Sequence, residues 1–220
     1  MIKYHPSEQQ LLQFAEGTLP AAESLMLSAH CDMCTVCQER LRYHSENMAK
    51  TSLHDEADNP ALDRMLANII QQPEAERPSL NYSSPSTIEL DGRRFAVPRA
   101  LRRYIHKTGN WSSLVGKLWQ APVDLGDIGM AHFIYMEKGG RVPEHTHKGS
   151  ELTLVINGEF SDGIADYDSG DFIAMNGSHT HAPGSDADEG CLVFSIVDKP
   201  LHFTSGLARL LNPFSHLFFK

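Results

Sequence analysis

The chain has 220 residues, of which 41% are hydrophobic and 21% charged, enough for one or two globular domains. A formal charge of −9 argues against nonspecific binding to nucleic acid or to an anionic membrane surface. No apolar run approaches the roughly 20 residues that cross a bilayer, and the N-terminus carries no apolar signal region. A cytoplasmic protein without a membrane partner is therefore expected.

Three amphipathic helices are predicted in the first 55 residues. Ser7 and Gln10 have the spacing of a capping box, and the apolar stripe that follows ends at Gly17, which suits a helix C-terminus. A second helix is predicted over residues 20–30, because proline is favoured in a first helical turn. A third starts near Cys34 and continues into the fifties.

A fourth helix is predicted between Pro60 and Pro73. Its apolar side chains recur at positions i, i+3, i+4, i+7 and i+8, which places them on one face. That face either completes the protein's own core or is available to a partner. Its residues are Leu62, Met65, Leu66, Ile69 and Ile70.

Three of the four cysteines lie within seven residues, next to a histidine. His30 and Cys34 are one helical turn apart, and Cys34 and Cys37 have the spacing of a structural zinc knuckle. Thiolate and imidazole ligands together favour zinc over magnesium or calcium. His5 is the best candidate for the fourth ligand, whereas Cys31 is out of phase with this face. A redox dithiol is the alternative, but the strand–helix–strand context of such chemistry is missing.

The composition changes after the helices. Residues 73–86 hold three prolines and four serines, which indicates a semi-extended linker. From residue 87 the apolar periodicity is that of β-strands and continues to residue 197, enough for a single barrel. The predicted organisation is a helical domain over 1–72, a linker over 73–86 and a β domain over 87–220.

A second metal site is predicted in the β domain. His145 and His147 are one residue apart on a strand, so they point to the same face. Glu151 can join them from the next strand after a short polar turn, and this donor set suits a divalent transition metal. With Gly139 before it and Gly158 after it, where the strand is expected to end, the spacing resembles the first conserved motif of the cupins in every element.

The second cupin motif is less regular. Gly170 and Asp171 open it well, but residues 175–177 read Met-Asn-Gly where the family usually has a proline-x-glycine step. His179 and His181 compete as the fourth ligand. His181 is favoured, because His-Ala-Pro resembles the ending of many such motifs. The predicted fold is thus a small zinc-stabilised helical bundle joined to one cupin jelly-roll barrel.

The order of these features over nearly the whole chain resembles the zinc-dependent anti-sigma factors of the ChrR type. In that family the helical domain binds an extracytoplasmic-function sigma factor and keeps it from core RNA polymerase. The cupin-like domain binds a second zinc and mediates the response to singlet oxygen or related oxidants. Carried over by position, the first zinc falls to His5, His30, Cys34 and Cys37, and the second to His145, His147, Glu151 and His181.

The resemblance implies a regulator of transcription without catalytic residues. From the apolar stripe we expect the fourth helix to lie with that face in a groove of the sigma factor. Residues 1–84 carry six basic and 12 acidic side chains, a charge of −6 that disfavours direct DNA binding. The rival hypothesis is a cupin metalloenzyme, a dioxygenase or isomerase, with an appended structural zinc module.

Overall fold

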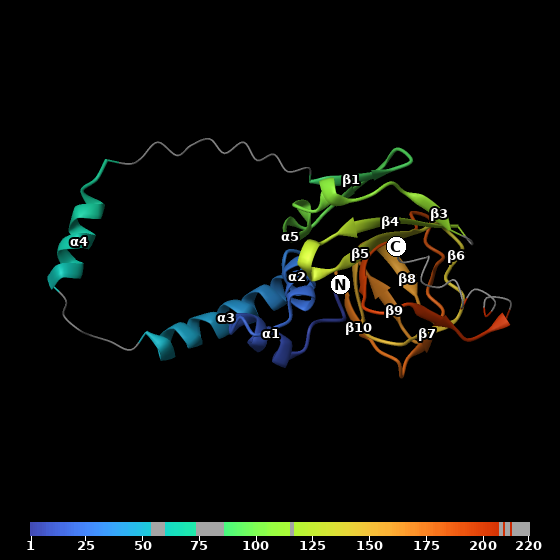
Figure 1. Ribbon diagram of the computed structural model, residues 1–220, viewed down its shortest axis with the longest axis horizontal. Coiled ribbons are helices and arrows are strands. Elements are labelled where there is room, and N and C mark those ends of the chain that lie inside the picture. Colours follow the sequence, from blue (N-terminus) through green and yellow to red (C-terminus); the bar gives the residue numbers. More distant parts are fainter. Residues whose placement is uncertain (54–59, 74–85, 115–116, 207–208, 210–211, 213–220) are drawn as a thin grey trace.

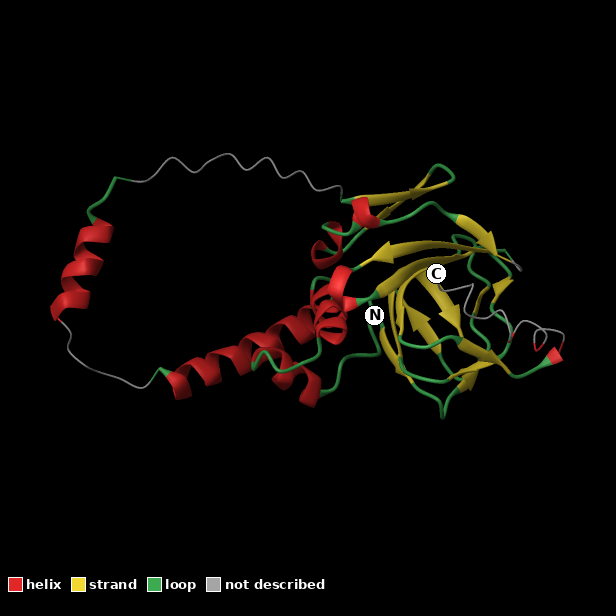
Figure 2. Cartoon of the chain, in the orientation of Figure 1, coloured by secondary structure: helices red, strands yellow, loops and turns green. Residues whose placement is uncertain are grey.

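The computed structural model describes residues 1–53, 60–73, 86–114, 117–206, 209 and 212. Three helices pack together at one end of a β-barrel, with the second of them against the barrel, and a fourth helix lies apart from both (Figure 1). Coloured by secondary structure, the chain separates into a helical N-terminal part and a strand-rich remainder, as predicted (Figure 2).

The helices form where the sequence predicts them: α1 Glu8–Ala15, α2 Ala21–Cys31, α3 Thr35–Ser52 and α4 Pro60–Ile70. The capping box of α1 is confirmed. The Ser7 side chain accepts a hydrogen bond from the backbone N–H of Gln10, and the Gln10 side chain accepts one from the N–H of Ser7. Two of the unsatisfied N–H groups at this helix start are thereby paired. None of the described helices is long and apolar enough to cross a membrane.

Helix α4 does not join the predicted bundle. All eleven of its residues are exposed, and Figure 1 shows it separated from α1–α3 and from the barrel. The exposed fractions of its apolar stripe are 54–72%. The stripe therefore completes no core within the described part of the chain. This leaves the other interpretation, a face that is available to a partner.

The strands form a barrel of the cupin type. A sheet with the order β3-β4-β5-β13-β8-β12-β6 carries β9 and β10 on β8, a smaller sheet has the order β11-β7-β14, and β1 pairs with β2. Short helices α5 (Arg99–Arg102), η1 (Ile105–Lys107) and η2 (Gly126–Ile128) interrupt the strands. The strands are β1 Thr87–Leu90, β2 Arg93–Ala96, β3 Ser112–Leu114, β4 Leu118–Asp124, β5 Met130–Met136, β6 Gly140–Arg141, β7 His145–His147, β8 Glu151–Ser161, β9 Asp166–Asp168, β10 Phe172–Met175, β11 Thr180–His181, β12 Gly184–Ser185, β13 Cys191–Val197 and β14 Leu201–Phe203.

The central strand β8 is longer than predicted. Gly158 was expected to end it, but the strand continues to Ser161, so that prediction is wrong. Gly158 has φ +83°, and a Cβ atom there would lie 2.1 Å from the carbonyl oxygen of Gly190 on the neighbouring segment. The glycine is needed because a side chain would collide with the adjacent strand, not because the strand stops.

Helix α2 and the barrel share one hydrophobic core. Leu25, Met26 and Ala29 of α2 are buried in the same cluster as Phe133 and Phe194 of the barrel. Burying a side chain of this size contributes about 1.5–3 kcal/mol. The two regions are therefore packed on each other, and the end of α2 is held against the barrel rim.

Candidate metal centres

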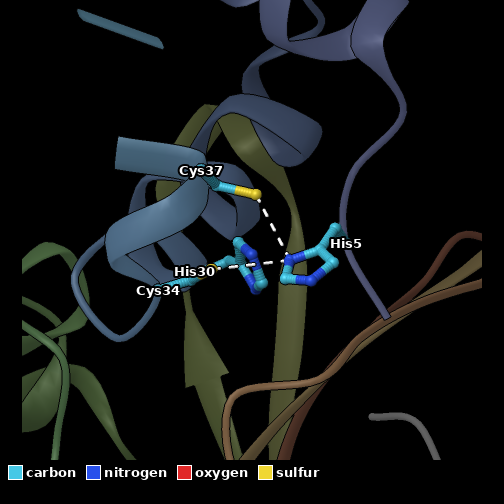
Figure 3. Close-up of side chains that lie close together, drawn as sticks. All are labelled: His5, His30, Cys34 and Cys37. Carbon is cyan, nitrogen blue, oxygen red and sulfur yellow. Dashed lines mark hydrogen bonds between the residues drawn. The ribbon is translucent and has the colours of Figure 1, made fainter. Parts of the chain in front are cut away.

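The first centre lies where the N-terminal segment, the end of α2 and the start of α3 meet (Figure 3). The four side chains predicted from the sequence are brought together, with one donor atom of each within 4.8 Å of the others. His5 Nδ1 lies 3.4 Å from both Cys34 Sγ and Cys37 Sγ. In tetrahedral zinc sites, neighbouring nitrogen and sulfur ligands are about 3.5 Å apart. The separations fit that geometry.

The orientation of His30 is fixed from outside the centre. Its Nδ1 hydrogen-bonds the carbonyl oxygen of Gly170 at 2.8 Å, so Nδ1 carries the proton. The other ring nitrogen, Nε2, is buried and has no hydrogen-bond partner among the described residues. A buried acceptor without a partner costs roughly 1–3 kcal/mol. A metal ion among these four donors would satisfy it.

Burial sets the electrostatics of this centre. It raises the pKa of the Cys37 thiol to about 12, with the neighbouring Cys34 adding to the effect, and it lowers the pKa of His30 to about 4. At pH 7 Cys37 is therefore a neutral thiol and His30 a neutral imidazole, and a metal must displace the Cys37 proton. Cys31 is buried in the adjacent hydrophobic cluster and is not among the four converging residues, in agreement with the sequence analysis.

The second centre lies inside the barrel. His145 and His147 are both buried on β7 while Thr146 between them points the other way, and Glu151 begins the next strand, as predicted. Strand β11 pairs with β7 so that His181 lies opposite His145. His181 Nε2 is 2.9 Å from His147 Nε2 and 3.0 Å from His145 Nε2.

His181 rather than His179 completes this group. The ring of His179 accepts a hydrogen bond from the backbone N–H of Asn176 and stabilises the turn after β10. His181 instead converges with His145, His147 and Glu151, and one donor atom of each of these four lies within 4.8 Å of the others. Strand β11 begins at Thr180, so His181 pairs with His145 across the ladder, whereas His179 precedes the strand and lies in the turn.

The ring nitrogens of the three histidines face one another. At 2.9–3.0 Å, two imidazole lone pairs repel unless a proton or a metal ion lies between them. Glu151 Oε2 faces the same point, 2.9 Å from His147 Nε2, whereas Oε1 accepts hydrogen bonds from the hydroxyls of Thr153 and Ser195. One carboxylate oxygen is thus held in place by hydroxyls, and the other is directed at the imidazole nitrogens.

The spacing of these donors differs from that of the first centre. Two imidazole nitrogens on one metal are about 3.4 Å apart at a tetrahedral angle and about 3.0 Å apart at a right angle. The observed 2.9 and 3.0 Å fit right angles, which leave further coordination positions free. A cavity of about 160 Å³ adjoins the donors and is lined mainly by apolar side chains, among them Ile134, Ile173 and Val193.

The ligands of the barrel centre are ready to bind a metal at neutral pH. Burial lowers the pKa of His145 to about 4, and also lowers that of His181. Burial alone would raise the pKa of Glu151, but the hydrogen bond and charge of His147 outweigh it and lower that pKa to about 2. No proton has to leave these three groups at pH 7.

The residues that support the ligands were not found in the sequence. Thr153 and Ser195 orient Glu151, Asp162 lies behind His181, and the carbonyl oxygen of Gly170 orients His30. Such outer contacts fix ring orientation and tautomer. Ser195, Asp162 and Gly170 have no spacing signature, because each comes from a part of the chain distant from its ligand, whereas Thr153 is two residues from Glu151 on the same strand.

A helical region with a His₂Cys₂ cluster, packed on a barrel with a His₃Glu cluster, defines a cupin protein with two candidate metal centres. Residues 106–199 match the family described as the ChrR cupin-like domain. The chain is 30% identical to the anti-sigma-E factor ChrR of Cereibacter sphaeroides over 221 aligned positions, which cover 97% of this chain and 98% of that protein. The chain belongs to the ChrR family of anti-sigma factors.

A solved structure supports the fold. The chain matches the ChrR chain in a crystal structure of Rhodobacter sphaeroides SigE in complex with the anti-sigma ChrR. The TM-score is 0.65 at 22% identity, over 90% of this chain and 100% of that chain. The arrangement of helices followed by a cupin-like barrel is therefore that of the family.

Proposed function

We propose that this chain sequesters an extracytoplasmic-function sigma factor through its helical region and releases it when the barrel responds to an oxidative signal such as singlet oxygen. Membership of the ChrR family and the solved complex of the similar ChrR chain with SigE support the partner. The single observation that carries the proposal on this chain is the exposed apolar face of α4.

The stripe on α4 has the form of a helix that binds in a groove. Leu62, Met65, Leu66, Ile69 and Ile70 repeat along one face and are each more than half exposed, whereas Asp63, Arg64 and Asn68 lie off that face. A soluble protein leaves such a face exposed at a cost unless a partner covers it. We assign this face to the sigma factor.

The test is a charge placed in the centre of the stripe. Leu66→Asp should lower sigma-factor affinity at least 100-fold, because a buried carboxylate would face an apolar groove. Asn68→Asp adds the same charge on the opposite side of the helix and should change affinity less than threefold. Affinity is measured by titration calorimetry, with helix content and zinc content as controls for folding. Equal sigma-factor affinity of both variants would show that α4 is not part of the interface.

We assign zinc to both centres. The two thiolates of the first centre favour zinc, and its four donors leave no position free, as in structural sites. The barrel centre would hold its metal through His145, His147, Glu151 and His181, and the metal would supply a Lewis-acidic position facing the cavity. Metal analysis should give two zinc ions per chain. His5→Ala and His181→Ala should each remove one, and loss of neither would refute the assignment.

We place the protein in the cytoplasm. All four cysteines are free thiols, as a reducing compartment keeps them.

The barrel centre is assigned to signal reception because it has free coordination positions and an adjoining cavity. His181→Ala in the full chain should leave repression intact and abolish induction in a reporter strain. Normal induction of that variant would exclude the barrel metal from signalling.

A further inference from the structure

The turn of the barrel between β9 and β10, residues 168–171, contacts the N-terminal segment just before His5. We call it the barrel turn. The fully buried carboxylate of Asp171 accepts hydrogen bonds from the backbone N–H groups of Lys3 and Tyr4 at 2.6 and 3.0 Å. Phe172, the next residue, donates its N–H to the carbonyl oxygen of Tyr4 at 3.0 Å. The residue preceding His5 is thus held by the barrel through both of its backbone groups.

The same turn holds a second ligand. The carbonyl oxygen of Gly170 accepts the 2.8 Å hydrogen bond from His30 Nδ1, which turns Nε2 toward the centre. Gly170 has φ +95°, and a Cβ atom there would lie 2.4 Å from the side chain of Ile2. The positive φ favours glycine here, and any side chain would also have to displace that of Ile2. The Asp171 carboxylate also accepts from the N–H of Asp168, which fixes the turn itself.

We propose that the barrel turn positions His5 and His30, so that the barrel controls the metal affinity of the first centre. Asp171 is the positioning residue, because one carboxylate joins the turn to the segment that carries His5. The proposal rests on the metal assignment made above for His5, His30, Cys34 and Cys37. It makes the first centre a joint site of two regions rather than a property of the helices.

The contacts continue from the N-terminal segment to the barrel centre. The ring of Tyr4 packs on that of Tyr167 with centroids 4.8 Å apart, and the Tyr167 hydroxyl donates to Asp162 Oδ2 at 3.0 Å. The same oxygen lies 3.6 Å from Nδ1 of His181. Two side chains, Asp162 and Tyr167, thus connect a ligand of the second centre with Tyr4, the residue before a ligand of the first. Rearrangement of His181 would alter the support of His5, which is a route for release.

Cobalt substitution in the full-length protein tests the positioning. Only the first centre contains sulfur, so thiolate-to-cobalt absorption reports that centre alone. Asp171→Asn should lower the Co²⁺ affinity of the first centre at least tenfold in chelator competition. The amide has one acceptor oxygen, so it cannot accept hydrogen bonds both from the N-terminal segment and from the N–H of Asp168. Asp168→Asn is the matched control. Its carboxylate makes a half-exposed 3.1 Å ion pair with the side chain of Lys3 and accepts no backbone hydrogen bond from the N-terminal segment among the described residues, so affinity should change less than twofold.

Wild-type affinity in a folded Asp171→Asn protein would overturn the proposal. If the wild type itself showed no thiolate absorption, the metal assignment would fail instead, so the two failures are distinguishable. Amide hydrogen exchange of Lys3 and Tyr4 in the wild type is the second measurement and does not depend on a variant. Both amides should be protected, and exchange at the rate of an unstructured segment would equally overturn the proposal.

The connection between the centres has its own test. Zinc in the barrel centre should change the Co²⁺ affinity of the first centre at least threefold, and Tyr167→Phe should abolish that dependence while retaining ring packing on Tyr4. The His181→Ala protein, which lacks the barrel metal, supplies the reference affinity. Identical dependence in wild type and Tyr167→Phe would exclude this route.

Discussion

The two candidate centres are built from different atoms and lie in different surroundings. The first combines two thiols with two imidazoles, and its sulfur–nitrogen separations of 3.4 Å match a closed tetrahedron. The second has three imidazoles and a carboxylate at 2.9–3.0 Å, inside the barrel and beside a cavity. A closed site stabilises the segments that it joins, whereas a site with free positions can bind something further. For this reason we assign a structural role to the first centre and a role in the response to the signal to the second.

The residues that orient the ligands also come from different places in the two centres. In the barrel, the hydroxyls of Thr153 and Ser195 hold Glu151 within one sheet. At the first centre, the support comes from across the junction, through Gly170 and the segment held by Asp171. The first centre therefore depends on how two regions pack, whereas the contacts that orient Glu151 in the second come from the barrel itself.

Loss of a thiolate should produce the largest difference between the centres. Cys37→Ser should lower zinc affinity at the first centre at least 1,000-fold, about 4 kcal/mol, and abolish sigma-factor binding, because the metal joins the N-terminal segment to α2 and α3. His181→Ala should cost the second zinc and change sigma affinity less than threefold. Zinc content and calorimetry measure both. A similar loss of sigma-factor binding in both variants would contradict the assignment of different roles to the two centres.

Truncation of the shared core tests whether helices and barrel unfold together. Met26 of α2 is fully buried against the barrel, so Met26→Ala should lower the free energy of unfolding by about 2–5 kcal/mol. Urea transitions followed by helical circular dichroism and by tryptophan fluorescence should coincide and shift together. Two separate transitions would mean that the helical region is independent of the barrel. Exposed Val36→Ala on α3 is the control and should shift neither.

Removal of one supporting hydroxyl should affect the barrel centre alone. Thr153→Val deletes a 2.9 Å hydrogen bond to Glu151 Oε1 at nearly constant volume. Metal affinity of the second centre should fall about 10- to 100-fold, as is typical when an outer contact of a ligand is lost. With the barrel centre saturated with zinc, the thiolate absorption and Co²⁺ affinity of the first centre should be unchanged. A loss at the first centre under that condition would show that barrel support is not local.

The centres should also respond differently to pH. Because burial raises the pKa of Cys37 to about 12, binding at the first centre releases that proton, and affinity should fall at least tenfold per unit as pH falls from 8 to 7. The pKa values of His145 and Glu151 are lowered to about 4 and about 2, so these ligands are deprotonated throughout that range. They should contribute no pH dependence until pH approaches 4. Chelator competition at several pH values measures both slopes, and equal slopes would contradict the assignment.

Much of the architecture was predictable because it depends on local spacing. The capping box at Ser7, the stripe on α4 and the pair His145 and His147 each follow from a period of 3.6 or two residues. The position of α4 was not predictable. An amphipathic pattern shows that a face is apolar but does not say what covers it, and here the described chain leaves it exposed. Gly158 shows the same limit, because its neighbour Gly190 is 32 residues away.

The sequence by itself determined the ligand types and the local halves of both centres: His30, Cys34 and Cys37 around one helix junction, and His145, His147 and Glu151 around one turn. Tertiary structure decided the rest. Strand pairing placed His181 rather than His179 opposite His145, and the barrel turn held the segment of His5 through Asp171. The physical reason is the sequence separation of the residues, because backbone periodicity fixes the relative orientation of side chains only when they are a few residues apart. Groups more than 25 residues apart meet only where packed elements bring them together.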